Sequence, residues 1–457
     1  MAENAQQLVR ALEGLIGRRL PLRVRTWDGS QAGPPGAPTI VLRNRRALRR
    51  LICAPGELGL ARAYVAGDLE LDPGTDLYEV LDAVAAFAED PDIRALRLGP
   101  RHFLGAPGRR LLAAALRLGA LGPVPAPPPE EVRSRRGSLH SRRRDRAAIS
   151  HHYDVGNDFY GLVLGPTMVY SCAYWTPDSK SLEDAQEAKL DLICRKLGLR
   201  PGMRLLDVGC GWGSLVLHAA RHYGVQAVGV SISTEQVALA RQRVAEAGLA
   251  DRIEIRLQDY REIPDGPFDA ISSVGMAEHV GSAQYLVYAR HLYDLLAPGG
   301  RLLNHQIARR PLDPGEKYRL SPFIDRYVFP DGELSPVGAT VTRLEEAGFE
   351  VRDVEALREH YGRTLREWVA NLEAHWPDAA ALAGRGRARV WRLYMSACAL
   401  AFEQNRIGIN QVLAVRPTPA GASRLPATRA QWLAEATEQH RPTGAADTDL
   451  GDQPSVR

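Results

Sequence analysis

The chain has 457 residues, of which 45% are hydrophobic and 25% are charged, so it is long enough for two or three domains with sizeable cores. Its net charge is only +4 and its five cysteines are scattered, which argues against a zinc site or a disulfide scaffold, so we expect no metal and a cytoplasmic protein. The apolar runs are far shorter than the roughly 20 residues of a spanning helix, and the N-terminus lacks a signal-peptide pattern, so neither membrane insertion nor export is expected.

The first 120 residues combine helical and strand patterns. A helical pattern opens the chain, TIVLRN at 39–44 resembles a strand, and further helical patterns surround Leu60–Tyr64 and Leu77–Phe87. This mixture predicts a small α+β domain at residues 1–120. Its residues show no chemistry that we can interpret, and both lipid docking and a homodimer contact are compatible uses for it.

A proline-rich stretch, PVPAPPPE at 123–130, precedes the basic run RSRRGSLHSRRRDR at 133–146. Because proline joins neither a helix interior nor a central strand readily, residues 121–149 are predicted to be a Pro/Arg-rich, semi-rigid linker. Arginine clusters of this kind attract anionic surfaces, whether phospholipid or nucleic acid. A solvated face or a disordered linker is the alternative interpretation.

Residues 150–416 alternate strand-like and helical patterns. The strand-like segments are MRLLDVG, VQAVGVS, RIEIRLQ, FDAISSVG and GRLLNHQIA. This alternation predicts an α/β fold with a mostly parallel sheet that is covered on both faces. Beyond about residue 310 the pattern becomes helical and aromatic, and we expect a helical cap, inserted after the fifth strand, over the C-terminal edge of the sheet. The polar tail, residues 417–457, is expected to be partly disordered.

A glycine-rich turn stands between the first strand and helix of this region, in LLDVGCGWGSL. Its glycines, Gly209, Gly211 and Gly213, permit a tight turn and let a ligand approach the backbone. A dinucleotide-binding fold is the competing interpretation, but the third glycine of its G-x-G-x-x-G pattern would fall at Ser214. With Asp207 preceding it, the turn instead resembles the first motif of class I methyltransferases, which implies S-adenosylmethionine (SAM) as cofactor.

The second strand of this region lacks the acidic residue that many class I methyltransferases use to hold the ribose. It ends VGVSIS, and Ser231, Ser233 and Gln236 can still form hydrogen bonds with a ribose or an adenine. This difference indicates a subfamily and does not argue against the cofactor.

A longer resemblance covers roughly residues 150–415. The segment SHHYDVGNDFYGLVLGPTMVYSCAYW at 150–175 closely resembles the cyclopropane-fatty-acyl-phospholipid synthase family, which includes the mycolic acid cyclopropane synthases. The likeness continues through LLDVGCGWG, SVGMAEHVG, RYVFPDGELSP and MSACALAFEQNRI. AYVAGDLEL, in the first domain, is similar to part of the family's additional N-terminal domain.

The resemblance implies methyl transfer from SAM to the double bond of an unsaturated phospholipid acyl chain. The alkene attacks the sulfonium methyl to give a carbocation, and a base then removes a proton to close a cyclopropane. Family members hold a bicarbonate ion for this last step, and its ligands at the matching positions would be Cys172, Glu278, His305, Ile307 and Tyr361. These groups suit a small anion in a dry pocket, and a buried carboxyl of raised pKa suits proton transfer.

Structural roles compete with some of these assignments. A buried cysteine such as Cys172 is usually a small packed hydrophobe, and a tyrosine near a helical stretch, such as Tyr361, is usually part of a core. His305 is predicted to stand at a strand end, where ligands gather in such sheets. Cys398 matches a family cysteine proposed for the active site, but an attacking alkene needs no thiolate, so a structural or pocket-lining role is favoured.

The family's cofactor positions correspond to five short stretches of this chain. They contain Tyr170, Ser171, Asp207, Gly209, Cys210, Gly211, Gly213, Ser231, Ser233, Gln236, Asp259, Tyr260 and Arg261. Aromatic residues near the sulfonium and the cation, among them Tyr170 and Trp175, could contribute about 1–2 kcal/mol of cation–π stabilisation.

The same cation can react along a second path, in which a hydride shift precedes proton loss and gives a 10-methylene fatty acid. The Arg- and Ala-rich composition is similar to that of the actinobacterial branch containing such enzymes, and the sequence does not decide between the two products. A nucleic-acid methyltransferase is disfavoured because SVGMAEHVG stands where a base-methylating motif would be. We therefore expect phospholipid acyl chains and the anionic inner face of a membrane, bound peripherally, as partners, and no nucleic acid.

Overall fold

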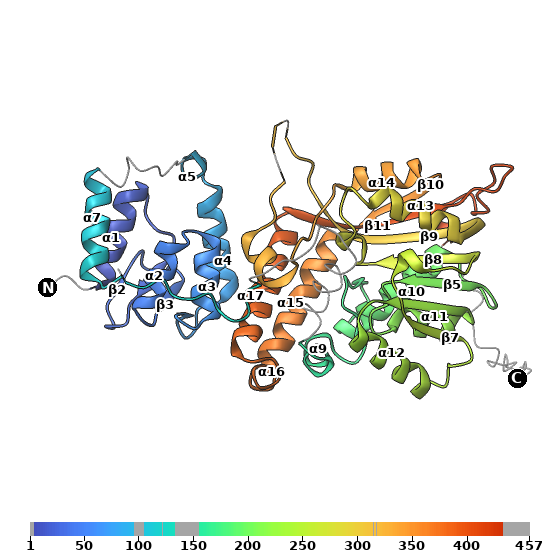
Figure 1. Ribbon diagram of the computed structural model, residues 1–457, viewed down its shortest axis with the longest axis horizontal. Helices are drawn as coiled ribbons and strands as arrows, with labels where there is room; N and C mark the ends of the chain where they lie inside the picture. Colours follow the sequence, from blue (N-terminus) through green and yellow to red (C-terminus); the bar gives the residue numbers. More distant parts are fainter. Residues whose placement is uncertain are drawn as a thin grey trace, which may run out of the picture.

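The computed structural model describes residues 4–95, 105–120, 122–132, 155–313, 315–316 and 318–432. Two β-sheets lie at opposite ends of an elongated molecule, with a layer of helices between them (Figure 1). The basic run 133–146, the start of the 150–175 segment and the end of the predicted tail lie outside the described residues.

The N-terminal unit is a mixed sheet with helices packed around it. Its elements are α1 (Asn4–Ile16), β1 (Arg23–Arg25), β2 (Gln31–Ala32), β3 (Thr39–Leu42), α2 (Arg45–Cys53), α3 (Glu57–Val65), β4 (Leu69–Leu71), α4 (Leu77–Glu89), α5 (Pro91–Ala95) and α7 (Ala106–Arg117). The strand order is β2-β1-β3-β4, and β1 and β3 are the parallel pair. The predicted small α+β fold of this region is confirmed.

The second unit is a seven-stranded sheet in the order β10-β11-β9-β8-β5-β6-β7, in which β11 runs antiparallel to its neighbours. Its elements are α9 (Asn157–Leu164), α10 (Leu182–Leu197), β5 (Arg204–Val208), α11 (Ser214–Tyr223), β6 (Gln226–Ser231), α12 (Thr234–Glu246), β7 (Ile253–Leu257), η1 (Tyr260–Glu262), β8 (Phe268–Val274), η2 (Ala277–His279), α13 (Tyr285–Leu295), β9 (Leu296–Arg309), η3 (Ile324–Val328), α14 (Val337–Glu346), β10 (Glu350–Ala356), α15 (Arg358–Ala374), α16 (Trp376–Ala383), α17 (Arg385–Glu403) and β11 (Ile407–Val415). The predicted mostly parallel sheet is confirmed.

The helical cap enters the fold later than predicted. It consists of α15, α16 and α17, which follow the sixth strand of the sheet, β10, and precede the seventh, β11. Sequence reasoning missed both strands because β10 is an edge strand with alternate residues exposed and rich in charge, and because β11 directly follows a long helix. The cap nevertheless covers the carboxyl edge of the sheet, since Trp368 and Trp391 share a core with Trp212 of the loop after β5.

The central strand β9 separates two different environments. Leu303 packs in the core beneath α10 and α11, whereas Leu302 packs in the core beneath α13 and α14. Because side chains alternate along a strand, His305 and Ile307 lie on the α10 side, and Asn304 and Gln306 lie on the α13 side. The strand continues to Arg309, so His305 stands inside β9 and the expectation of a strand-end position is wrong.

A buried carboxylate ties the proline-rich segment to both units. Glu131 accepts two hydrogen bonds from the guanidinium of Arg62 on α3, at 2.6 and 2.7 Å, and one from the hydroxyl of Tyr327 in η3 at 3.1 Å. Burial opposes ionisation, but these donors and Arg326 outweigh it and hold the pKa of Glu131 below its usual value. The end of the proline-rich segment is therefore fastened to η3 of the second unit and to α3 of the N-terminal unit by charge-assisted hydrogen bonds.

Membrane-spanning helices were also sought. Within the described ranges, every helix is too short or too polar to cross a bilayer.

Candidate active site

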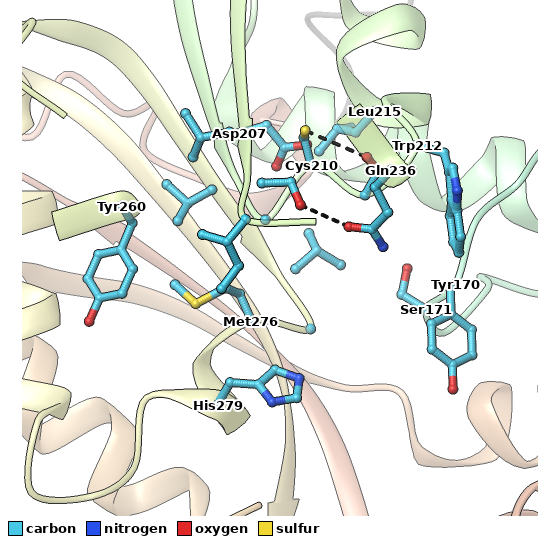
Figure 2. Close-up of a pocket in the computed structure, with 18 of the residues that line it drawn as sticks. Tyr170, Ser171, Asp207, Cys210, Trp212, Leu215, Gln236, Tyr260, Met276 and His279 are labelled. Carbon is cyan, nitrogen blue, oxygen red and sulfur yellow. Dashed lines mark hydrogen bonds between the residues drawn. The ribbon is translucent and has the colours of Figure 1, made fainter. Parts of the chain in front are cut away.

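A pocket opens at the carboxyl ends of β5, β6 and β8, the place where open α/β sheets bind ligands. Tyr260 bounds one side of it, and Tyr170 and Ser171 bound the opposite side (Figure 2). The predicted cofactor residues that line the pocket are Tyr170, Ser171, Asp207, Gly209, Cys210, Gly211, Ser231, Gln236, Asp259, Tyr260 and Arg261. The other two, Gly213 and Ser233, are the N-cap residues of α11 and α12.

The glycine-rich turn leaves room for a ligand against its backbone. Gly209 has a φ of 82°, and a Cβ atom there would lie 3.0 Å from the Met276 side chain, which itself lines the pocket. Gly213 has a φ of 80°, and its Cβ would lie 3.3 Å from that of Ala240 on α12. Both positions therefore require glycine, one beside the pocket and one for helix packing.

Asp207 is buried at the floor of the pocket and is 3% exposed. Ser272 on β8 donates its hydroxyl hydrogen to Oδ1 of Asp207 at 2.7 Å. Burial raises the pKa of Asp207 to about 6, despite the opposing effect of this hydrogen bond. A carboxyl held in this way is suited to a cationic group of a ligand.

The polar residues after β6 form one hydrogen-bonded group. Ser231 donates to Oε1 of Gln236 at 2.9 Å and accepts from the backbone N–H of Ser233 at 3.2 Å. Ser233 uses its own hydroxyl to cap α12 by accepting from the backbone N–H of Gln236. Ser233 therefore acts as a helix cap, while Ser231 and Gln236 are held together in the lining of the pocket.

Asp259 is fixed by the residue two positions after it. The guanidinium of Arg261 donates to both carboxylate oxygens at 2.8 and 2.6 Å, and the backbone N–H of Arg261 donates to Oδ1 at 3.0 Å. Arg261 also lies over the ring of Tyr260, with 5.4 Å between the guanidinium carbon and the ring centroid. This side of the pocket is consequently rigid and polar.

Tyr170 joins the pocket to the aromatic core of the cap. Its ring centroid lies 5.2 Å from that of Trp368 and 5.8 Å from that of Trp391. Trp175 is different, because Arg363 lies 3.8 Å above its ring and its indole N–H donates to Thr364. Tyr170 therefore contributes aromatic surface to the pocket, together with Trp212 and Tyr260, whereas Trp175 already stacks with a cation of the protein.

Of the six predicted catalytic residues, Glu278 and Ile307 are in direct contact. The backbone N–H of Ile307 donates to Oε1 of Glu278 at 2.8 Å, and Oε2 of Glu278 is buried without a hydrogen-bond partner in the described chain. Burial raises the pKa of Glu278 to about 7. Glu278 lies in η2, between the pocket residues Met276 and His279.

His305 lies on the same face of β9 as Ile307. Its Nδ1 is 3.1 Å from Nε2 of Gln411 on β11, and its Nε2 is buried without a partner among the described residues. With the Gln411 amide as donor, the ring hydrogen is on Nε2. Burial, aided by Lys189 and Lys196, lowers the pKa of His305 well below its usual value, so the imidazole is neutral.

Cys172 and Tyr361 are both linked to β11 through Leu357. The thiol of Cys172 donates to the carbonyl of Leu357 at 3.7 Å, and the backbone N–H of Tyr361 donates to that carbonyl at 3.1 Å. Leu357 in turn donates to Ile409 of β11, which pairs with Ile307. Burial raises the pKa of the Cys172 thiol, so it is uncharged.

Cys398 lies on α17, one turn after Tyr394. Burial raises the pKa of its thiol to about 12, although a hydrogen bond with Tyr394 acts in the opposite direction. A protonated thiol fits the favoured structural or pocket-lining role.

Several pocket residues were not anticipated from the sequence. They are Lys189, Gln258, Met276, His279 and Gln284. Met276 and His279 flank Glu278 in SVGMAEHVG, a segment that carries the family resemblance. Their closeness to Glu278 in the sequence could therefore have identified them. Lys189 carries little local signal in LEDAQEAKLDLICRKL, because Gln186 and Lys196 are buried on the same helix.

Comparison with known proteins gives consistent matches. A family profile described as mycolic acid cyclopropane synthetase matches residues 140–412. A probable fatty acid methyltransferase of Mycobacterium tuberculosis is 45% identical over 89% of this chain and 93% of its own length. The cyclopropane-fatty-acyl-phospholipid synthase of Escherichia coli K12 is 40% identical over 62% of this chain and 72% of its own. The crystal structure of the mycolic acid cyclopropane synthase CmaA1 with S-adenosylhomocysteine (SAH) and CTAB has a TM-score of 0.55 and 36% identity, covering 59% of this chain and 97% of that one.

The strand order, the glycine-rich pocket and these relatives define a class I SAM-dependent methyltransferase. Within that class, the chain belongs to the mycolic acid cyclopropane synthase family, whose members act on lipid acyl chains.

The close approach at Gly209 leads to a first prediction. Gly209→Ala should weaken SAH binding by about tenfold or more, because the new methyl group displaces Met276 into the pocket. Isothermal titration calorimetry with SAH measures the change. Gly248→Ala is the matched control, since Gly248 has a φ of 65° at the end of α12 with nothing within 4 Å. It should lose about 1 kcal/mol of stability and keep its affinity. Wild-type affinity in Gly209→Ala would contradict the assignment of this turn.

Proposed function

We propose that this enzyme transfers the methyl group of SAM to the double bond of unsaturated phospholipid acyl chains and forms cyclopropane fatty acids. The main support is the position of two buried proton-handling groups beside the cofactor pocket: Glu278 lies between the pocket residues Met276 and His279, and His305 pairs with the pocket residue Val274. When bound, SAM supplies an electrophilic methyl group, and the alkene needs no nucleophile from the protein. The tasks left to the chain are to exclude water, stabilise positive charge and accept a proton.

The residues around β9 fit a small anion such as bicarbonate. Among the residues that the structure describes, the N–H of the neutral His305 imidazole and Oε2 of Glu278 have no hydrogen-bond partner, and Glu278 is held by Ile307, two residues after His305. The thiol of Cys172 and the backbone N–H of Tyr361 both donate to the carbonyl of Leu357, which links these two residues to β11 beside β9. Uncharged donors in a dry site are what a single bound anion requires, since buried polar groups without partners cost free energy.

Glu278 is proposed to pass on the proton that the substrate loses. A carboxyl with a pKa of about 7 is close to the working pH, where proton acceptance and release are both possible. The hydrogen bond from Ile307 fixes Oε1 and leaves Oε2 for this exchange.

A 10-methylene product is the second candidate. It is favoured by the match to a tuberculostearic acid methyltransferase of Mycobacterium tuberculosis over 88% of this chain, whereas the match to the Escherichia coli cyclopropane synthase spans 62% of it. The two outcomes differ in whether a 1,2-hydride shift moves the positive charge to the methyl-bearing carbon before the added methyl group loses a proton.

The function is tested by incubating the purified protein with SAM and a monounsaturated phospholipid, with and without bicarbonate. Fatty acid methyl esters heavier by one CH2 group, with cyclopropane protons upfield of the methyl signals in the NMR spectrum, are the expected result. Vinylidene protons would instead identify the methylene product. If SAH binds but no lipid product forms, the substrate class is wrong.

The environment of Glu278 predicts a pH dependence. Because ionisation is complete only above a pKa of about 7, turnover should rise between pH 6 and 8 as the carboxylate forms. Glu278→Gln should lower turnover by about 100-fold or more, remove this rise and leave SAH affinity unchanged. Glu333→Gln is the control, because that carboxylate holds Ser282 nearby and should not alter the profile. An unchanged profile in Glu278→Gln would exclude the proposed role.

Docking on an anionic membrane is also proposed, through α7 at the outer end of the N-terminal unit (Figure 1). Leu112 and Leu116 are 52% and 59% exposed and stand one turn apart. Arg109, Arg110 and Arg117 are exposed on the same helix. Apolar side chains flanked by arginines are suited to the boundary between headgroups and acyl chains.

The double variant Leu112→Ser/Leu116→Ser should reduce binding to phosphatidylglycerol vesicles by about tenfold or more in co-sedimentation. Val287→Ser, which changes an exposed apolar residue on α13 (58% exposed), should bind normally. Wild-type binding should weaken with salt, since charges are screened within about 8 Å at physiological ionic strength. Binding that is indifferent to salt and lipid charge would exclude this surface. It would also be excluded if the wild type were a dimer and the double variant a monomer, because α7 would then be a contact between subunits.

A further inference from the structure

A lysine amino group is buried in the wall of the cofactor pocket. Lys189, in the middle of α10, is 2% exposed and lines the pocket together with Ser171 and Asp207. Its Nζ donates a hydrogen bond to the Ser171 hydroxyl at 2.8 Å. Burial lowers the pKa of Lys189 to about 8, so the ammonium form is retained near neutral pH at a cost in desolvation.

No carboxylate of the described chain pairs with this ammonium. Asp207 is close enough for the two charges to influence each other, yet they form no ion pair. Lys196, two turns further along the same helix and 1% exposed, shows the usual arrangement, because it pairs with Glu355 and Asp353. A buried lysine is normally paired, so Lys189 is an exception that calls for an anionic partner from outside the protein.

The chemistry of the pocket identifies that partner. A buried carboxylate and a buried ammonium that face one cavity without contacting each other are complementary to a zwitterion. The amino-acid end of SAM is such a group, with an α-ammonium and an α-carboxylate. We propose that Lys189 binds the α-carboxylate of SAM directly and that Ser171 orients its amino group. This inference rests on the SAM cofactor of the proposed function.

Two other roles for Lys189 lead to different measurements. Lys189 could act only by holding Ser171 in place, in which case loss of the Ser171 hydroxyl would have the same consequence. It could instead serve an anion beside His305, whose pKa it helps to lower. In that case cofactor affinity would not depend on it.

The test compares two ligands by isothermal titration calorimetry: SAH, and its decarboxylated analogue, which keeps the ammonium and lacks the carboxylate. Lys189→Met should weaken SAH binding by about 10- to 100-fold, the usual value of a charge-assisted hydrogen bond, and should leave the affinity for the analogue unchanged. Methionine has a similar shape, so thermal unfolding should show a folded protein.

Lys196→Met removes an equally buried ammonium outside the pocket and should bind SAH as the wild type does. Ser171→Ala should reproduce only a small part of the loss. The inference is overturned if Lys189→Met binds SAH normally, if it loses both ligands equally, or if Ser171→Ala shows the full selective loss. Failure of the wild-type protein to bind SAH would instead refute the proposed function.

Discussion

Buried ionisable groups near the carboxyl edge of the sheet require the rest of the structure to keep water away from them and to satisfy their hydrogen bonds. Asp207, Lys189, Glu278 and His305 are withdrawn from water, and burial shifts the pKa of each toward its neutral form. Such groups are stable only where water is excluded and where hydrogen bonds or a ligand satisfy them. The aromatic cap over the carboxyl edge provides this exclusion, which explains why a large part of the chain is inserted between the last two strands.

The strand β9 organises the polar groups of the site by its alternation. On its α13 side, Gln306 accepts from the hydroxyl of Tyr285 and from the Asn304 side chain, and donates to Thr340. This fully bonded layer anchors the strand. On the opposite side, Nε2 of His305 has no hydrogen-bond partner within the described ranges, and the backbone N–H of Ile307 holds Glu278. One strand thus supplies a structural face and the face that carries the groups proposed for proton transfer.

The N-terminal unit is joined to the cap through arginine pairs. Arg389 on α17 pairs with Glu70 and donates to the carbonyl of Tyr64, and Arg62 holds Glu131 of the proline-rich segment. These contacts link α3 and β4 of the N-terminal unit directly to α17 of the cap and to the proline-rich segment.

Local pattern in the sequence determined the five parallel strands and the turn of Gly209, because hydrophobic periodicity and glycine placement act over a few residues. Resemblance to a family added the Glu278 region. Tertiary structure alone decided that β10 and β11 complete the sheet, because an edge strand and a strand after a helix lack a clear local signal. It also placed Lys189 in the cofactor pocket, since the depth at which a helical lysine is buried depends on the strands and loops that pack against it.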